Sequence, residues 1–125
     1  MSPLLILLDA NALMMPFQFA LDLEQELVRL LGAYRAAVPS SVVRELEGLS
    51  SGNPKARAAL RYAARFPAIK AEGVGDDALF ALALAEGAAV LTNDRDLRRR
   101  LRAAKLPVIY LRERSRLEAL GLPPG

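Results

Sequence analysis

The stretch Leu4-Leu5-Ile6-Leu7-Leu8-Asp9 decides how the rest of the chain is arranged. Five consecutive apolar residues near the N-terminus favour a strand that is buried on both faces, as in a parallel sheet. A carboxylate at the end of such a strand lies at the carboxyl edge of the sheet, where open α/β folds bind their ligands. Asp9 is therefore the first candidate functional residue.

Apolar segments further along the chain predict more strands with helices between them. We expect strands at 36–38, 68–71, 88–91 and 106–111. We expect helices at 22–31, from 42 onwards, at 55–65, 78–86 and 97–104, and a last short helix at 113–120. Asp22 and the pair Ser40-Ser41 are candidate caps for two of these helices. Alternating strands and helices indicate an α/β fold with a parallel sheet, in one domain over residues 1–125.

The composition excludes several classes of protein. The 125 residues include no cysteine and no histidine, which excludes disulfide scaffolds, Cys/His zinc sites and catalytic triads that need histidine. Any acid–base or metal chemistry must use carboxylates, hydroxyls, amides or water. No apolar run approaches the roughly 20 residues of a membrane span, and the chain does not open like a signal peptide. We expect a cytoplasmic protein with no membrane segment.

Acidic residues from four separate segments fall where a strand or loop leads into a helix. They are Asp9, Glu45, the pair Asp76 and Asp77, and Asp94 with Asp96. In a parallel sheet these junctions lie along one edge, and carboxylates gathered there would raise one another's pKa. A divalent cation removes that conflict, and all-oxygen ligation suits Mg²⁺ or Mn²⁺. Such an ion polarises a phosphoryl oxygen and lowers the pKa of an attacking water.

Each of these residues also has a purely structural interpretation. Asp76 and Asp94 are in position to cap helices, Asp96 to favour a helix dipole, and Glu45 to be a solvated helix charge. Asn11 and Thr92 are either turn formers or hydrogen-bond partners of the carboxylates. The joint pattern, rather than any single residue, predicts a metal site.

The formal net charge is +3, and the positive residues are mostly arginine, clustered from Arg95 to Arg116. A clustered basic segment is either a solvated helix face or a surface that binds phosphates. The candidates for holding a nucleic-acid backbone are Arg95, Arg98, Arg99, Arg100 and Arg102.

At these positions the chain resembles the PIN-domain nucleases. The matching pieces are LLILLDANALMMPFQF, VPSSVVRELEGL, GDDALFALALAEGAAVLTNDRDLRRRL and LPVIYLR, in the order and at the spacing of the family. The first piece and TNDRDLRRRL are most similar to small archaeal PIN proteins related to eukaryotic ribosomal-RNA-processing endonucleases. The PIN ribonucleases of toxin–antitoxin pairs share the acidic pattern less closely in the flanking residues.

The resemblance implies a three-layer α/β/α, Rossmann-like PIN fold with a mostly parallel sheet of four or five strands. It implies an Mg²⁺- or Mn²⁺-dependent endoribonuclease that cleaves single-stranded RNA, in rRNA processing or as a toxin. The acidic positions of the family match Asp9, Glu45, Asp77 and Asp94, with Asp96 as a frequent fifth and Asp76 as an alternative to Asp77. Its small polar positions match Asn11 and Thr92. The family also suggests a homodimer and a partner that is either an antitoxin or a ribosome-assembly protein.

Two other classes of function remain to be weighed. A non-catalytic RNA-binding or ribosome-assembly module would keep the acidic cluster and bind RNA without cleaving it. A phosphoacceptor receiver domain also combines an acidic pair with an aspartate at a strand end. In that fold the pair should follow the first strand, whereas here it is Asp76-Asp77, and no lysine follows the last strand. The receiver interpretation is therefore disfavoured.

Overall fold

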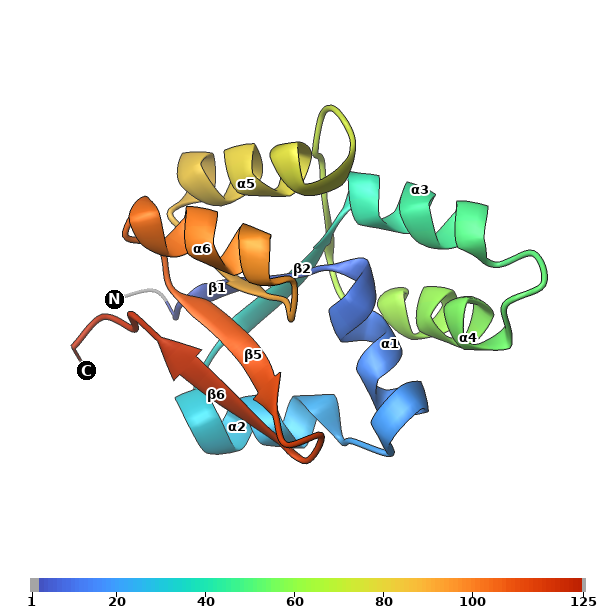
Figure 1. Cartoon of the computed structure of the whole chain (residues 1–125), viewed down its shortest axis with the longest axis horizontal. Helices are drawn as coiled ribbons and strands as arrows, with labels where there is room; N and C mark the ends of the chain where they lie inside the picture. Colours follow the sequence, from blue (N-terminus) through green and yellow to red (C-terminus); the bar gives the residue numbers. More distant parts are fainter. Residues whose placement is uncertain (1–2, 125) are drawn as a thin grey trace.

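The computed structural model describes residues 3–124 and contains a six-stranded sheet between two layers of helices (Figure 1). The strands are β1 (Leu5–Leu8), β2 (Arg35–Pro39), β3 (Ala68–Ile69), β4 (Ala89–Leu91), β5 (Val108–Arg112) and β6 (Arg116–Leu120). Their order in the sheet is β3-β2-β1-β4-β5-β6, and only β6 pairs antiparallel to its neighbour. The predicted α/β fold with a mostly parallel sheet is confirmed, with six strands instead of four or five.

The helices divide the core into two halves, one on each face of the sheet. They are α1 (Ala10–Phe19), α2 (Leu23–Leu31), α3 (Ser40–Leu49), α4 (Pro54–Ala63), α5 (Gly75–Glu86) and α6 (Arg95–Ala103). Ile6 and Leu8 pack with α1 to α4, while Leu7 packs with α5 and α6. Because side chains alternate between the two faces of a strand, the apolar run of β1 fills both halves of the core.

Helix α1 was not predicted, because Pro16 lies in its interior. Proline has no N–H to donate and usually interrupts a helix. The helix begins at a strong cap, since Oδ1 of Asp9 accepts a hydrogen bond from the backbone N–H of Ala12 at 2.7 Å. Leu13 and Met15 are buried on its inner face, and this burial offsets the missing hydrogen bond.

The predicted helix at 113–120 is wrong, because this segment is a turn followed by β6. Glu113 and Arg114 have φ angles of 55° and 60°, and the N–H of Ser115 donates to the carbonyl of Arg112 at 3.2 Å. Consecutive left-handed residues form the turns that suit hairpins, and glycine or asparagine usually supplies them. Neither residue type is present here, so the sequence carries no signal for the turn.

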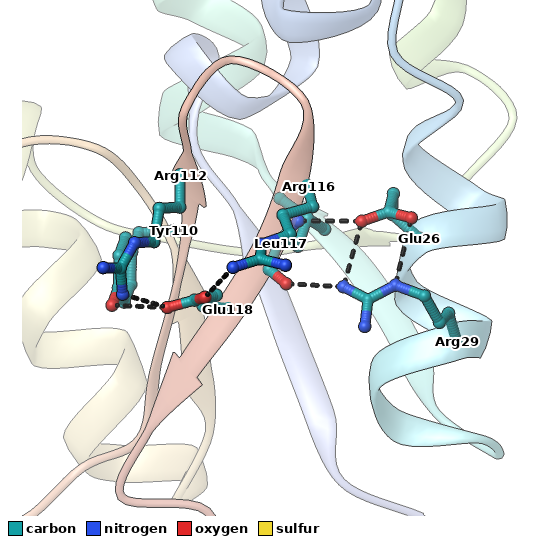
Figure 2. A network of polar contacts seen from close by, with 7 residues as sticks. All are labelled: Glu26, Arg29, Tyr110, Arg112, Arg116, Leu117 and Glu118. Carbon is teal, nitrogen blue, oxygen red and sulfur yellow. Dashed lines mark hydrogen bonds and ion pairs between the residues drawn. The ribbon is translucent and has the colours of Figure 1, made fainter.

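Helix α2 covers part of the free edge of β6 with an ion pair, as Figure 2 shows. Oε1 of Glu26 accepts a hydrogen bond from the N–H of Leu117 at 2.8 Å, and Nη2 of Arg29 donates to the carbonyl of Leu117 at 2.7 Å. Glu26 and Arg29 also pair with each other at 3.1 Å. The two side chains thus bind the Leu117 backbone as a neighbouring strand would, which protects this edge from pairing with other chains.

We expect Glu26→Ala to lower the free energy of unfolding by about 1–3 kcal/mol, because the N–H of buried Leu117 loses its acceptor. The N–H of Leu117 and the guanidinium of Arg29 both lower the pKa of Glu26. Its stabilising effect is therefore present above the unfolded-state pKa and is lost as the pH falls through the folded-state value. Urea unfolding at pH 7 and pH 3 measures both effects. Exposed Glu47→Ala is the control, and an equal effect of the two substitutions would contradict the role of Glu26.

Candidate active site at the carboxyl edge of the sheet

A cavity of about 280 Å³ opens at the carboxyl ends of β1 and β4. The direction of the strand order reverses between these two strands, and open α/β sheets bind ligands at such a switch point. Four carboxylates from four segments line the cavity: Asp9, Glu45, Asp76 and Asp94. The other lining residues are Ala10, Asn11, Met14, Gln18, Ser41, Val42, Leu49, Gly75 and Leu79.

Asp9 and Asp94 occupy equivalent positions on the neighbouring strands β1 and β4. Each follows its strand and caps the next helix, because one oxygen accepts a backbone N–H three residues later, at 2.7 Å from Ala12 and 2.8 Å from Leu97. Both residues also line the cavity. The positions expected from the sequence, Asp9 at a strand end and Asp94 in the turn between a strand and its helix, therefore place both carboxylates at the same site.

Asp9 has the most perturbed titration of the acidic residues. Burial raises its pKa from 3.8 to about 7, although hydrogen bonds from the Thr92 hydroxyl and the Ala12 N–H act in the opposite direction. The charges of Glu45 and Asp76 raise it further. Asp9, Glu45 on α3 and Asp76 on α5 all line the same cavity.

Glu45 and Asp76 are perturbed in the same direction. Desolvation raises the pKa of Glu45, and the negative charge of Asp76 adds to this. Desolvation also raises the pKa of Asp76, with a further contribution from Asp94 and an opposing one from Arg100. The cavity therefore holds acidic groups that oppose each other's ionisation.

The structure places Asp76, and not Asp77, on the cavity. Asp77 points outward with 88% of its side chain exposed and pairs with Nη1 of Arg100 at 2.7 Å. Helix α5 begins at Gly75, three residues earlier than expected, and adjacent residues of a helix point about 100° apart. The geometry therefore favours Asp76 for the role that the resemblance gave to Asp77. Asp96 lies outside the cavity, where it pairs with Arg99 at 3.4 Å.

The segment that precedes Asp76 is hydrogen-bonded to the first turns of α3. The hydroxyl of Ser40 accepts a hydrogen bond from the N–H of Ala71 at 2.9 Å and donates to its carbonyl at 3.2 Å. Nη2 of Arg44 donates to the carbonyl of Gly73 at 3.1 Å. Ser40 therefore serves this contact and does not cap α3, whose N-cap is Pro39.

The predicted polar partners lie where the resemblance placed them, and three further residues join them. Asn11 lines the cavity, while buried Thr92 supports both strand ends, since its Oγ1 accepts the N–H of Asp94 at 3.1 Å. Sequence reasoning missed Ser41, Met14 and Gln18, which also line the cavity. The spacing of Asn11, Met14 and Gln18 fits one helix face, but α1 itself was not predicted.

Four of the five candidate arginines share one face of α6. Arg95, Arg98, Arg99 and Arg102 surround a surface hollow of about 360 Å³ together with Leu120. Their spacing of three and four residues is that of a helix face. Arg100 instead pairs with Asp77 and lies over the ring of Phe80 at 4.5 Å. The structure therefore separates Arg100 from the other four.

The donor set of the cavity suits a hard divalent cation, because every candidate ligand is an oxygen. The raised pKa values of Asp9, Glu45 and Asp76 agree with this, since a cation would remove the repulsion between their charges. Among residues 3–124, no three acidic side chains converge closely enough to bind one ion together. The residues therefore fit an ion that keeps several water ligands, as Mg²⁺ does.

We expect Asp9→Asn to raise the melting temperature at pH 8 in EDTA. The folded state binds the Asp9 proton more tightly than the unfolded state, so stability falls as the pH rises from about 4 to about 7. Asparagine is neutral throughout this range and caps helices as well as aspartate does. The gain should shrink towards pH 5, as thermal unfolding monitored by circular dichroism would show. Asp96→Asn is the control, and a gain that is the same at both pH values would contradict the raised pKa.

Comparison with known proteins gives a consistent result. Residues 6–114 match the family model described as a PIN like domain. The chain is 35% identical over 114 residues to Ribonuclease VapC9 of Archaeoglobus fulgidus, covering 87% of this chain and 84% of that protein.

A solved structure agrees with the sequence match. The PIN domain endonuclease Utp24 superimposes with a TM-score of 0.82 at 26% identity, over 96% of this chain and 93% of that one. The switch-point cavity and its carboxylates therefore lie in a fold shared with a solved PIN endonuclease. The chain belongs to the PIN-like domain family.

Proposed function

We propose that this protein is a divalent-metal-dependent endoribonuclease that hydrolyses phosphodiester bonds in single-stranded RNA. The observation that carries the proposal is the convergence of Asp9, Glu45, Asp76 and Asp94 on one cavity at the switch point of the sheet. The similarity to a protein named as a ribonuclease and to one described as an endonuclease supports it.

The proposed roles follow from where each carboxylate lies. Asp9, Asp76 and Asp94 would hold an Mg²⁺ or Mn²⁺ ion, directly or through water. When bound, the ion supplies charge neutralisation at the phosphate and a lower pKa for an attacking water. Glu45 on α3 lines the same cavity, where it would accept a hydrogen bond from an attacking water and orient it. The hydroxyl of Thr92 hydrogen-bonds to Asp9 and would hold it in place, and Asn11 lines the cavity beside the carboxylates.

We propose that the RNA backbone binds along the arginine face of α6, which we call the arginine track. It begins at Arg95, directly after the cavity residue Asp94, and continues along the helix to Arg102. A phosphate chain on this face would therefore lead into the cavity. The guanidinium of Arg98 lies 4.6 Å above the ring of Tyr110, which orients it on this surface.

The cellular setting is part of the proposal. The family resemblance gives two roles for such an enzyme, processing of ribosomal RNA with a ribosome-assembly partner, or toxicity controlled by an antitoxin. It also suggests a homodimer in the cytoplasm. Within residues 3–124, no helix is long and apolar enough to cross a bilayer. A protein that binds RNA without cutting it is the alternative function, and the cleavage experiment below distinguishes the two.

In Mn²⁺ we expect the wild type to cleave a labelled, partly single-stranded ribosomal-RNA fragment. EDTA should abolish cleavage, and Asp9→Asn should lower it by more than about 100-fold, beyond what loss of an outer partner of a metal site costs. Gel-resolved single-turnover rates would also compare Asp76→Asn with Asp77→Asn, and the loss should be larger for Asp76→Asn. Glu47→Gln is the control for Glu45→Gln. Tight binding without cleavage, unchanged by Asp9→Asn, would favour the non-catalytic alternative.

The arginine track predicts a salt-dependent affinity. Each phosphate contact on a single strand contributes about −0.7 to the slope of log K against log salt concentration. Arg95→Gln and Arg99→Gln should each make the slope shallower by about this amount, as fluorescence anisotropy in EDTA would measure. Arg61→Gln on α4 is the control. If Arg95→Gln and Arg99→Gln both keep the wild-type slope, as Arg61→Gln should, the RNA backbone does not bind along this face of α6.

A further inference from the structure

The cavity at the carboxyl edge is acidic at one end only. Helix α1 contributes Asn11, Met14 and Gln18, which are three and four residues apart and therefore share one face. Helix α3 contributes Glu45 and Leu49, which are also four residues apart. Of these five residues, only Glu45 carries a charge, so the two helices bring mostly apolar and amide groups to the cavity.

The two helices set the direction in which these groups follow one another. Both start at the carboxyl edge of the sheet, α1 directly after Asp9 and α3 directly after β2. At 1.5 Å per residue, Gln18 lies about 10 Å further along α1 than Asn11. Leu49 is likewise at the last turn of α3. The cavity therefore extends from the carboxylates at one end to Gln18 and Leu49 at the other.

Two apolar side chains line this cavity without being fully buried. Leu49 has 43% of its surface exposed, and Met14 is half-buried. Gln18 is exposed, and its amide makes no hydrogen bond to another residue within the part of the chain that the structure describes, 3–124. An aliphatic surface next to a free amide complements a flat ligand with apolar faces and a polar edge.

We propose that this end of the cavity is a nucleobase subsite for the nucleotide next to the scissile phosphate. The base packs on Met14 and Leu49, and the amide of Gln18 hydrogen-bonds its edge. This proposal rests on the proposed ribonuclease function, because the carboxylates at the other end must hold the phosphate. The residues that would contact the base line the same cavity as the carboxylates, so the base and the phosphate would occupy neighbouring parts of one site.

The amide also gives the subsite a preference among bases. The amide of glutamine has an acceptor oxygen next to an NH₂ donor group. In nucleic-acid recognition it forms two hydrogen bonds with adenine, one with N6 and one with N7. The aliphatic contacts do not distinguish one base from another, because every base has an apolar face. We therefore expect adenosine to bind best and the other bases to bind more weakly.

Neutral nucleosides test this subsite without involving the phosphate, the metal or the arginine track. Adenosine, guanosine, cytidine, uridine and free ribose would be titrated into the protein in EDTA and followed by NMR. The chain has only two glutamines and three methionines, so the side-chain signals are easily assigned. We expect the nucleosides to shift the amide signal of Gln18 and the methyl signal of Met14. Gln25 on α2 and buried Met15 are internal controls that should not shift.

Substitutions then separate the amide from the aliphatic surface. Gln18→Ala should weaken adenosine binding by about 2- to 10-fold, the value of one hydrogen bond, and remove most of the preference for adenosine. Leu49→Ala should weaken binding of all four nucleosides alike. The controls are Gln25→Ala and Leu84→Ala, the second a leucine with a similar exposure of 49%.

Two results would overturn the subsite. One is a set of shifts with ribose equal to those with nucleosides, and the other is unchanged nucleoside affinity in both Gln18→Ala and Leu49→Ala. Because these experiments involve no cleavage, their failure would leave the proposed ribonuclease untouched. Conversely, if nucleoside binding depends on the base but the protein cleaves no RNA, the result would support the nucleobase subsite and contradict the proposed ribonuclease function.

Discussion

The burial of one carboxylate, that of Asp9, is the constraint on which the rest of the structure depends. It ends the central strand β1, caps α1 through the N–H of Ala12, and lies in a cavity with three other acidic groups. Each of these arrangements fixes its position, and burial together with the charges of the neighbouring acidic groups raises its pKa to about 7 against the opposing effect of the hydrogen bonds. A neutral residue here would serve the fold better, since it would cap the helix without the charge repulsion. The retained charge is therefore explained by a ligand that needs it.

The same local design appears on both sides of the switch point. A buried strand is followed by an aspartate, and one oxygen of that aspartate caps the next helix. Asp9 comes directly after β1, and Asp94 comes three residues after the end of β4. The Thr92 hydroxyl hydrogen-bonds to Asp9 and accepts the N–H of Asp94. Because each carboxylate is held by a hydrogen bond to the backbone of its own helix, the two stay close in spite of the repulsion between their charges.

A strand, cap or turn of this structure could be predicted from the sequence where a few neighbouring residues determine it. The strand before Asp9 and the caps at Asp22 and Asp94 follow from residue type and spacing, and all three are present. The hairpin at Glu113 and Arg114 has no such signal, because neither residue favours positive φ. The choice between Asp76 and Asp77 was left open by the sequence, which favoured Asp77, whereas the structure places Asp76 on the cavity. It depends on the residue at which α5 begins, and a shift of one residue turns a side chain by about 100°.

The directions of the helix faces also explain why basic, acidic and uncharged side chains lie in different parts of the site. The face of α6 that carries Arg95, Arg98, Arg99 and Arg102 begins where the acidic end of the cavity lies, while α1 and α3 lead away from that end towards Gln18 and Leu49. The proposed phosphate-binding and base-binding groups are thus on different helices. On this proposal, a substitution on one helix would change affinity or base preference without moving the reacting groups. Selectivity would then depend on side chains towards the ends of α1 and α3, and the chemistry on the carboxylates at the carboxyl edge of the sheet.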